Sequence, residues 1–203
     1  VLPEFTVGTH GSRERELRQQ IVEIVRRAVG RYLMISTEGV VSRLDESSFL
    51  ITPTGVDRGS LTVQDLVLVR NGAREHGKMP SRSVRLHQAI YERHPEVNCA
   101  MTAQCPNVTA YAITGRPFDS RTIPESYIML RDVPTISFKT LYTDEKKVAG
   151  IVSLRRPVVL AQNDCILVVG ADVLNAFDRL EVAEYSARAL IDAARSGDFV
   201  PIG

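Results

Sequence analysis

The sequence predicts a single domain of mixed class, either α/β or α+β, and three observations support this prediction. Segments with a helical spacing of apolar residues alternate with short apolar runs along the whole chain. The 203 residues contain no internal repeat and no clear linker between domains. Apolar residues make up 44% of the chain and charged residues 24%, which is the balance of a globular protein that buries its own core.

The chain is expected to begin with a flexible arm over residues 1–12 and to continue as the single domain over residues 13–203. Glycine, proline and polar residues are frequent in the arm, which is typical of irregular structure. From Arg13 onward, apolar residues recur at helical spacing opposite a charged face, and Gly30 is a typical helix stop. We therefore expect the first helix between these two residues.

The remaining elements follow from the same two patterns. Short apolar runs predict strands over residues 33–36, 49–52, 66–69, 98–101, 127–130, 133–138, 158–160 and 166–169. Helical spacing predicts helices from residue 81 or 83 to about 93, from 106 to 115 and from about 172 to 195. Thr143 is the expected N-cap of one further helix. The pair Asn71-Gly72 predicts a tight turn.

Charge and composition exclude several classes of function. The chain has 25 Lys and Arg against 24 Asp and Glu, so it lacks the basic excess that pairs with nucleic-acid phosphates. No apolar run approaches the roughly 20 residues of a membrane span, and the first 20 residues are too charged for a signal peptide. Three cysteines in a chain of this size indicate reduced thiols. We expect a cytoplasmic protein with no nucleic-acid or membrane partner.

Two segments are candidates for binding an anion. Thr52–Gly55 follows a predicted strand; it is either a turn in which Gly55 supplies a positive φ, or a cradle of backbone N–H groups and hydroxyls for a phosphate. Ser81 is either a simple N-cap or part of a helix N-terminus that faces the same anion. Arg82 is either a solvated side chain or a bidentate partner of a phosphate or carboxylate.

Several further features follow one another in a characteristic order. They are a Gly-x-x-Ser turn at Gly39–Ser42, the strand start Asp65–Val67, the helix start with Pro80, Ser81 and His87, then Tyr91, the strand start Pro95–Val97, the Val-Val-Gly run Val168–Gly170, and the last helix with Ala176 and Glu181. Together with Thr52–Gly55, this order resembles the class II aldolase/adducin family, whose members include L-fuculose-phosphate and L-ribulose-phosphate relatives. The resemblance covers about residues 15–195.

The resemblance implies a three-layer α/β/α fold with a nine-stranded, mostly antiparallel central sheet flanked by helices. It also implies a homotetramer and a divalent metal, usually zinc, surrounded by three histidines and a nearby acid. In the family this metal polarises the carbonyl of a ketose phosphate and stabilises an enediolate, while a glutamate acts as acid and base.

The metal-site positions of this chain depart from the family pattern. Ser83 stands at the position of the glutamate, Thr102 and Gln104 at the His-x-His pair, and Asp164 at the third histidine. Hydroxyls and an amide are weak zinc ligands. The four histidines lie elsewhere, and His87 is expected to be a core residue. We therefore expect no cofactor, unless zinc or another divalent cation is held in a rebuilt site.

A rebuilt site would use the two thiols that follow the altered positions, Cys105 and Cys165, together with Asp164. Adjacent residues of a strand point to opposite faces, so Cys105 is expected to face away from Gln104 and from the site. This geometry makes the rebuilt site the weaker alternative.

The phosphate-binding positions match the family better. The matching residues are Thr52, Thr54, Gly55 and Ser81, while Arg82 replaces a serine and adds a cation, and Val40 replaces an asparagine. The resemblance thus predicts a degenerate member that lacks the zinc-dependent lyase activity and binds a small ligand bearing a phosphate or carboxylate. The alternative is an active sugar-phosphate aldolase, a carbon–carbon lyase, with a rebuilt metal site.

Overall fold

A nine-stranded sheet runs through the computed structural model, which describes residues 2–35, 39–200 and 202. The strand order is β1-β5-β4-β3-β2-β6-β9-β8-β7. Six of the eight pairings between described strands are antiparallel, and only the two at the edges, β1 with β5 and β7 with β8, are parallel. The expected nine-stranded, mostly antiparallel central sheet is confirmed.

The elements have the following bounds. The strands are β1 Glu4–Phe5, β2 Gly39–Arg43, β3 Ser48–Ile51, β4 Val67–Arg70, β5 Ala73–Glu75, β6 Cys99–Ala103, β7 Thr135–Ile136, β8 Val158–Ala161 and β9 Ile166–Gly170. The helices are α1 Ser12–Gly30, α2 Val84–Arg93, α3 Pro106–Thr114, α4 Pro124–Leu130, α5 Thr140–Thr143, α6 Glu145–Ile151 and α7 Val173–Ser196, with short 3₁₀ turns at Arg58–Ser60 and Ser120–Thr122.

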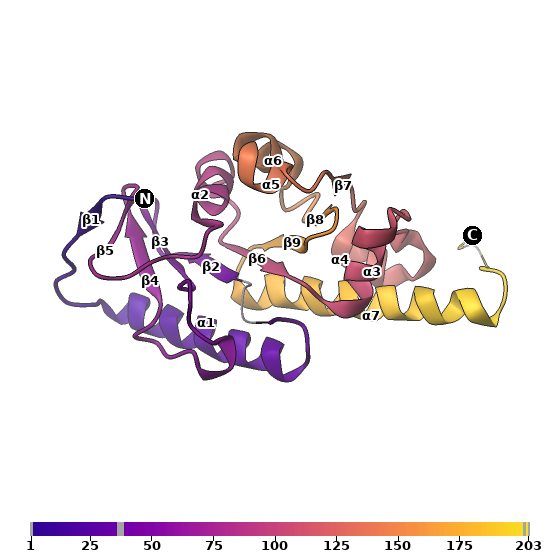
Figure 1. Cartoon of the computed structure of the whole chain (residues 1–203), viewed down its shortest axis with the longest axis horizontal. Helices are drawn as coiled ribbons and strands as arrows, with labels where there is room; N and C mark the ends of the chain where they lie inside the picture. Colours follow the sequence, from indigo (N-terminus) through magenta and orange to yellow (C-terminus); the bar gives the residue numbers. More distant parts are fainter. Residues whose placement is uncertain (1, 36–38, 201, 203) are drawn as a thin grey trace.

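Helices cover both faces of the sheet, as Figure 1 shows. Helices α1 and α7 lie along one face together with α3 and α4, and α2, α5 and α6 lie on the other. Successive residues of β6 alternate between two hydrophobic clusters: Met101 and Ala103 belong to the cluster beneath α1 and α7, and Ala100 to the cluster beneath α2 and α6. This period of two, with a helical layer on each side, confirms the three-layer α/β/α fold.

Local signals account for several boundaries. Pro106 is at the first helical positions of α3, and Gly115 ends that helix in the left-handed conformation, with φ 67°. Asn71 and Gly72 have φ values of 50° and 74°, so they form the tight turn between β4 and β5. The side chain of Asp172 accepts the N–H of Asn175 and caps α7.

Part of the predicted N-terminal arm, residues 1–12, forms a strand. Glu4–Phe5 forms β1, an edge strand that pairs in parallel with β5. The Glu4 carboxylate lies 2.5 Å from Arg74 Nη2 and 2.6 Å from His76 Nδ1. The sequence pattern did not predict this strand, because its partner is itself a three-residue strand about seventy positions away.

Other corrections concern short apolar runs. Residues 127–130 belong to the helix α4 rather than to a strand, because Pro124 starts a helix just before them. Only Thr135–Ile136 of the predicted strand 133–138 pairs with the sheet, and residues 33–35 form no strand, while position 36 lies outside the described residues. The cap of α6 is Asp144 rather than Thr143, since the Asp144 side chain accepts the Lys147 N–H.

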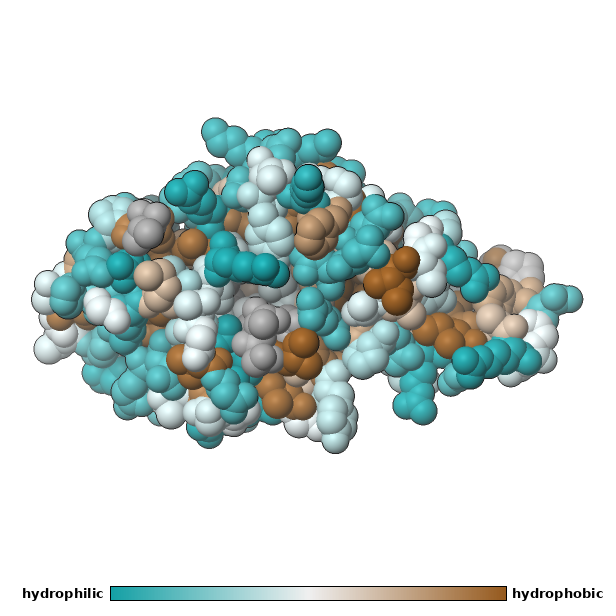
Figure 2. Space-filling model, in the orientation of Figure 1, coloured by the Kyte–Doolittle hydropathy of each residue, from teal (hydrophilic) through white to brown (hydrophobic). Residues whose placement is uncertain are grey.

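Apolar side chains on the surface are scattered. On the face shown in Figure 2, hydrophobic residues form separate patches within a mostly hydrophilic surface. Among the described residues, no helix combines the length and the apolar character needed to span a membrane.

Candidate functional site

The two segments predicted to bind an anion are held together at one end of the sheet. Thr52 follows β3, and Ser81 lies three residues before α2. The backbone N–H and the hydroxyl of Ser81 both donate to the carbonyl oxygen of Thr52, at 3.0 and 2.9 Å. The N–H of Thr54 donates to the carbonyl oxygen of Met79 at 2.9 Å. The two segments therefore form one corner, hereafter the β3–α2 corner, in which these donors are already used within the chain.

Gly39 allows this close approach. A Cβ atom at Gly39 would lie 2.8 Å from Thr52 Oγ1 and 3.2 Å from Ser81 Oγ, tighter than ordinary side-chain contacts. The segment Gly39–Ser42 was predicted to be a turn, but it is part of β2, in which Gly39 pairs with Thr102 of β6. Glycine is needed here because two buried hydroxyls fill the space of a side chain, and not because a turn needs a positive φ.

A cavity of about 460 Å³ opens beside the β3–α2 corner. It is lined by Thr54, Gly55, Val56, Asp57, Arg58, Ser81 and Arg82. Four of the five predicted anion-binding residues line it, and the fifth, Thr52, is fully buried. Gly55 has a φ of 73°, so the turn interpretation of this residue is confirmed. Whether the loop also cradles an anion stays a prediction.

Arg58 was not predicted, although it borders the same cavity. Its side chain is only 2% exposed, and Nη1 donates to the carbonyl oxygen of Val56 at 2.8 Å. A buried guanidinium adds fixed positive charge to one wall of the cavity. The sequence offered one indication that Arg58 belongs to the site, namely its position three residues after Gly55. An arginine at this position is equally typical of a surface loop.

Arg82 connects the cavity to a second group of side chains. Its guanidinium lies over the ring of Tyr142, 4.7 Å from the ring centroid, and Nη2 is 4.0 Å from Asp164 Oδ1. The Arg82 side chain is 68% exposed, whereas that of Asp164 is 5% exposed. The cation is therefore accessible to a ligand while it faces a buried carboxylate.

Asp164 lies in the turn between β8 and β9, next to Asn163, which has a positive φ of 57°. Its Oδ2 atom is buried and has no hydrogen-bond partner among the described residues. Burial, then the Cys165 thiol and the Asp164 carboxylate, raise the pKa of Tyr142, and the charge of Arg82 partly opposes this rise. Tyr142 therefore stays neutral, and Asp164 is close enough to influence it.

The residues predicted to stand at the metal positions of the family share this end of the sheet. Thr102 of β6 pairs with Gly39 on one side and with Leu167 on the other. Gln104 follows directly after the last register pair of this strand, Ala103 with Ile166. Thr52 follows the end of β3, and Asp164 precedes the start of β9, two strands that are separated by β2 and β6. These residues therefore lie at one end of the sheet on three of four neighbouring strands, across roughly 14 Å at about 4.8 Å per strand.

Ser83 lies at the start of α2, where the family has its glutamate. It is the N-cap of this helix and 6% exposed, but its side chain makes no capping hydrogen bond. Ser81, one of the two expected helix starts, belongs instead to the preceding turn, where its carbonyl oxygen accepts the Val84 N–H.

These residues do not fit the zinc that the family implies. Thr102 and Gln104 offer only neutral ligands, which leaves Asp164 as the single strong one. Cys105 is packed in the cluster on the opposite face of the sheet, where its thiol donates to the carbonyl oxygen of Leu33 at 3.2 Å. Within the part of the chain that the structure describes, no three His, Cys, Asp or Glu side chains come together as a metal site.

His87 is a core residue, as its spacing predicted. It is fully buried in α2, and neither ring nitrogen has a hydrogen-bond partner among the described residues. Burial lowers the pKa of His87 to about 3, so the imidazole is neutral at physiological pH.

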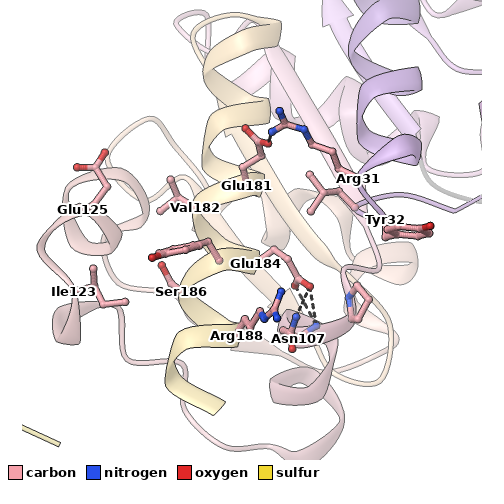
Figure 3. A pocket seen from close by; sticks show the side chains of 13 residues that line it. Arg31, Tyr32, Asn107, Ile123, Glu125, Glu181, Val182, Glu184, Ser186 and Arg188 are labelled. Carbon is pink, nitrogen blue, oxygen red and sulfur yellow. Dashed lines mark hydrogen bonds and ion pairs between the residues drawn. The ribbon is translucent and has the colours of Figure 1, made fainter. Parts of the chain in front are cut away.

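A larger cavity of about 570 Å³ lies elsewhere, between the end of α1, the start of α3 and α7 (Figure 3). Glu184 in this cavity accepts the backbone N–H groups of Asn107 and Val108 at 3.0–3.1 Å, and Glu181 pairs with Arg31. Glu184 therefore caps the start of α3, and Glu181 is neutralised by an arginine. None of the predicted site residues lines it.

Comparisons with known proteins identify the family. The model of the class II aldolase and adducin N-terminal domain matches residues 19–191. An L-fuculose phosphate aldolase of Escherichia coli O6:H1 is 27% identical over 194 residues, which cover 92% of this chain and 88% of the relative. A 5-methylthioribulose-1-phosphate/5-deoxyribulose-1-phosphate aldolase of E. coli O45:K1 is 29% identical over 64% of this chain and 62% of its own length.

Solved structures agree with this result. The YgbL protein of Klebsiella pneumoniae superposes with a TM-score of 0.80 at 26% identity, and the match covers 95% of this chain and 96% of YgbL. The L-fuculose-1-phosphate aldolase of Thermus thermophilus shares the fold, with a TM-score of 0.72 at 22% identity over 92% of this chain and 98% of its own. The family model matches most of the chain and these structures share its fold, so this protein belongs to the class II aldolase and adducin family.

Proposed function

We propose that this protein binds a small phosphate-bearing ligand in the cavity beside the β3–α2 corner and lacks the zinc-dependent lyase activity of its family. One observation carries the proposal: the cavity gathers Thr54, Gly55, Ser81 and Arg82, while the family's metal positions hold residues that do not fit zinc. The names of the curated relatives support a phosphorylated sugar as the ligand, because those relatives are named for sugar phosphates.

Arg82 is the main anion-binding residue of this proposal. The Ser81 hydroxyl and the N–H groups of Ser81 and Thr54 already donate to backbone carbonyls, so they add little without rearrangement. The guanidinium of Arg82 is exposed at the cavity and can form two charge-assisted hydrogen bonds to one phosphate. Arg58 adds a positive charge to another part of the cavity wall, and the exposed carboxylate of Asp57 on the same wall partly offsets it.

The first test measures binding of inorganic phosphate and L-fuculose 1-phosphate by isothermal titration calorimetry on chelator-treated protein. Arg82→Ala is expected to weaken binding of the sugar phosphate by about 10- to 100-fold, since hydrogen bonds to charged groups contribute roughly 1.5–3 kcal/mol. Arg85→Ala is the matched control, because Arg85 is exposed on α2, three residues after Arg82, and does not line the cavity. Equal affinities of the two variants, or no binding to the wild type, would contradict the proposal.

The second candidate is an active aldolase, which the names of the relatives favour. It needs a metal or a different acid and base, and Asp164 is the one carboxylate at the altered positions. We expect purified protein to contain no tightly bound zinc and to show no cleavage of L-fuculose 1-phosphate. One zinc per chain, together with activity that chelators and Asp164→Ala both abolish, would establish this alternative instead.

Self-association is also part of the proposal, because the family implies a homotetramer. Sedimentation velocity is expected to give a species of about 90 kDa, four times the 22.5 kDa of one chain. A single species at the mass of one chain would contradict it.

A further inference from the structure

One oxygen of the buried Asp164 carboxylate, Oδ2, has no hydrogen-bond partner in the described structure, although the neighbouring Tyr142 hydroxyl interacts with the same carboxylate. An ionised carboxylate accepts several hydrogen bonds, and leaving a buried oxygen without one costs free energy. Oδ2 of Asp164 is such an oxygen within the described structure. The nearest cation, on Arg82, is 4.0 Å from the other oxygen, which is too long for a hydrogen bond.

The position of this oxygen indicates what could satisfy it. Arg82 borders the anion cavity and its Nη2 lies 4.0 Å from Asp164 Oδ1. Asp164 itself does not line the cavity, so a ligand reaches the carboxylate when the exposed Arg82 side chain turns toward the ligand and away from Asp164. A ligand phosphate on Arg82 would draw this charge away from Asp164 and would place a second anion near it. The complex is more favourable when the ligand brings a hydrogen-bond donor to Asp164.

We infer that Asp164 determines specificity by accepting a hydrogen bond from a hydroxyl or ammonium group of the bound phosphate ester. The inference rests on the proposed anion site and adds a second recognition point to it. The residue at a family metal position would thus bind the ligand directly through a hydrogen bond, without a metal ion. The phosphate and the donor group of the ligand must lie within a few bonds of each other, because the Arg82 guanidinium borders the cavity and also lies near Asp164.

Three esters of similar size separate the possibilities: propyl phosphate has no donor, glycerol 1-phosphate has hydroxyls, and 3-aminopropyl phosphate has an ammonium group. Calorimetric titrations of the full chain in the presence of a chelator are expected to show binding of all three. At least one donor-bearing ester should bind about 10-fold or more tightly than propyl phosphate, and its identity shows which donor is recognised.

Variants then assign this preference to one side chain. Asp164→Leu is expected to bring the three affinities to within about twofold of each other, while propyl phosphate still binds. Asp178→Leu, a change of the same kind on α7, should keep the wild-type preference. If the leucine variant does not fold, Asp164→Asn keeps the shape and removes the charge, and should reduce the advantage of the ammonium ester by about 10-fold or more.

The outcomes separate this inference from the proposed function. Equal binding of the three esters to the wild type would overturn the role of Asp164 but would leave the anion site standing. Absence of binding by every ester would overturn both. A preference that survives Asp164→Leu, or that is seen only after zinc is added, would also overturn the inference.

Discussion

Gly170→Ala is expected to lower the free energy of unfolding by about 3 kcal/mol, the upper part of the range for overpacked cores. A Cβ atom at Gly170 would lie 2.5 Å from the backbone nitrogen of Ala176 and 2.9 Å from its Cα. Both atoms belong to the backbone at the start of α7, so no side-chain rotation can relieve the contact. Either β9 or the long C-terminal helix would have to move, and β9 is paired on both sides.

Urea-induced unfolding followed by circular dichroism measures this effect. Gly150→Ala is the matched control, because a Cβ at this position in α6 meets no atom closer than 3.9 Å. Alanine also favours the helix over glycine, so this variant is expected to gain roughly 0.5–1 kcal/mol. Wild-type stability of Gly170→Ala would mean that α7 does not pack against β9 as closely as described.

The second large effect is a loss of stability in mild acid caused by His87. The folded pKa of about 3 lies below the ordinary value of 6.5, so protonation favours the unfolded chain. The contribution is fully present above pH 6.5 and is lost as the pH falls toward 3. The expected loss averages about 1 kcal/mol per pH unit just below the unfolded pKa, or roughly 2 kcal/mol between about pH 6.5 and 4.5.

His87→Leu isolates this contribution, because carboxylates that titrate in the same range remain in both proteins. The variant is expected to lose correspondingly less stability between about pH 6.5 and 4.5, measured by urea unfolding at each pH. It also removes two buried nitrogens that have no partner among the described residues, so it should be at least as stable as the wild type near neutral pH. If the free energies of unfolding of the two proteins changed in parallel with pH, His87 would bind a proton as readily in the folded chain as in the unfolded chain, which would contradict this prediction.

The elements that local sequence predicts well have local causes. Proline at the start of α3 and Gly115 at its end act through backbone sterics, and the turn at Asn71-Gly72 needs the positive φ that these residues tolerate. For residues 127–130 the prediction of a strand was wrong, because a short apolar run suits a strand or a buried helix equally well. The helix there depends on Pro124 and on packing against α7.

The residues of the candidate site also fall into two groups, those that local sequence predicts and those that it does not. Thr54, Gly55, Ser81 and Arg82 could be predicted because they lie in two short motifs, and the structure brings these motifs to one cavity. Arg58 and Tyr142 could not, since a buried arginine and a stacked tyrosine look like surface residues until their neighbours are known. Asp164 was visible as a substitution, but its orphaned oxygen was not.

The sequence by itself determined the family and the three-layer fold, because these depend on residue types in a fixed order. It also predicts that the metal-binding residues of the family are replaced. Only the tertiary structure decided which side chains face one another. It paired β1 with β5, placed Cys105 on the far face of the sheet and set Arg82 between the cavity and Asp164. Such contacts join residues far apart in the chain, and burial gives their charges and hydrogen bonds an energetic weight that composition and spacing do not contain.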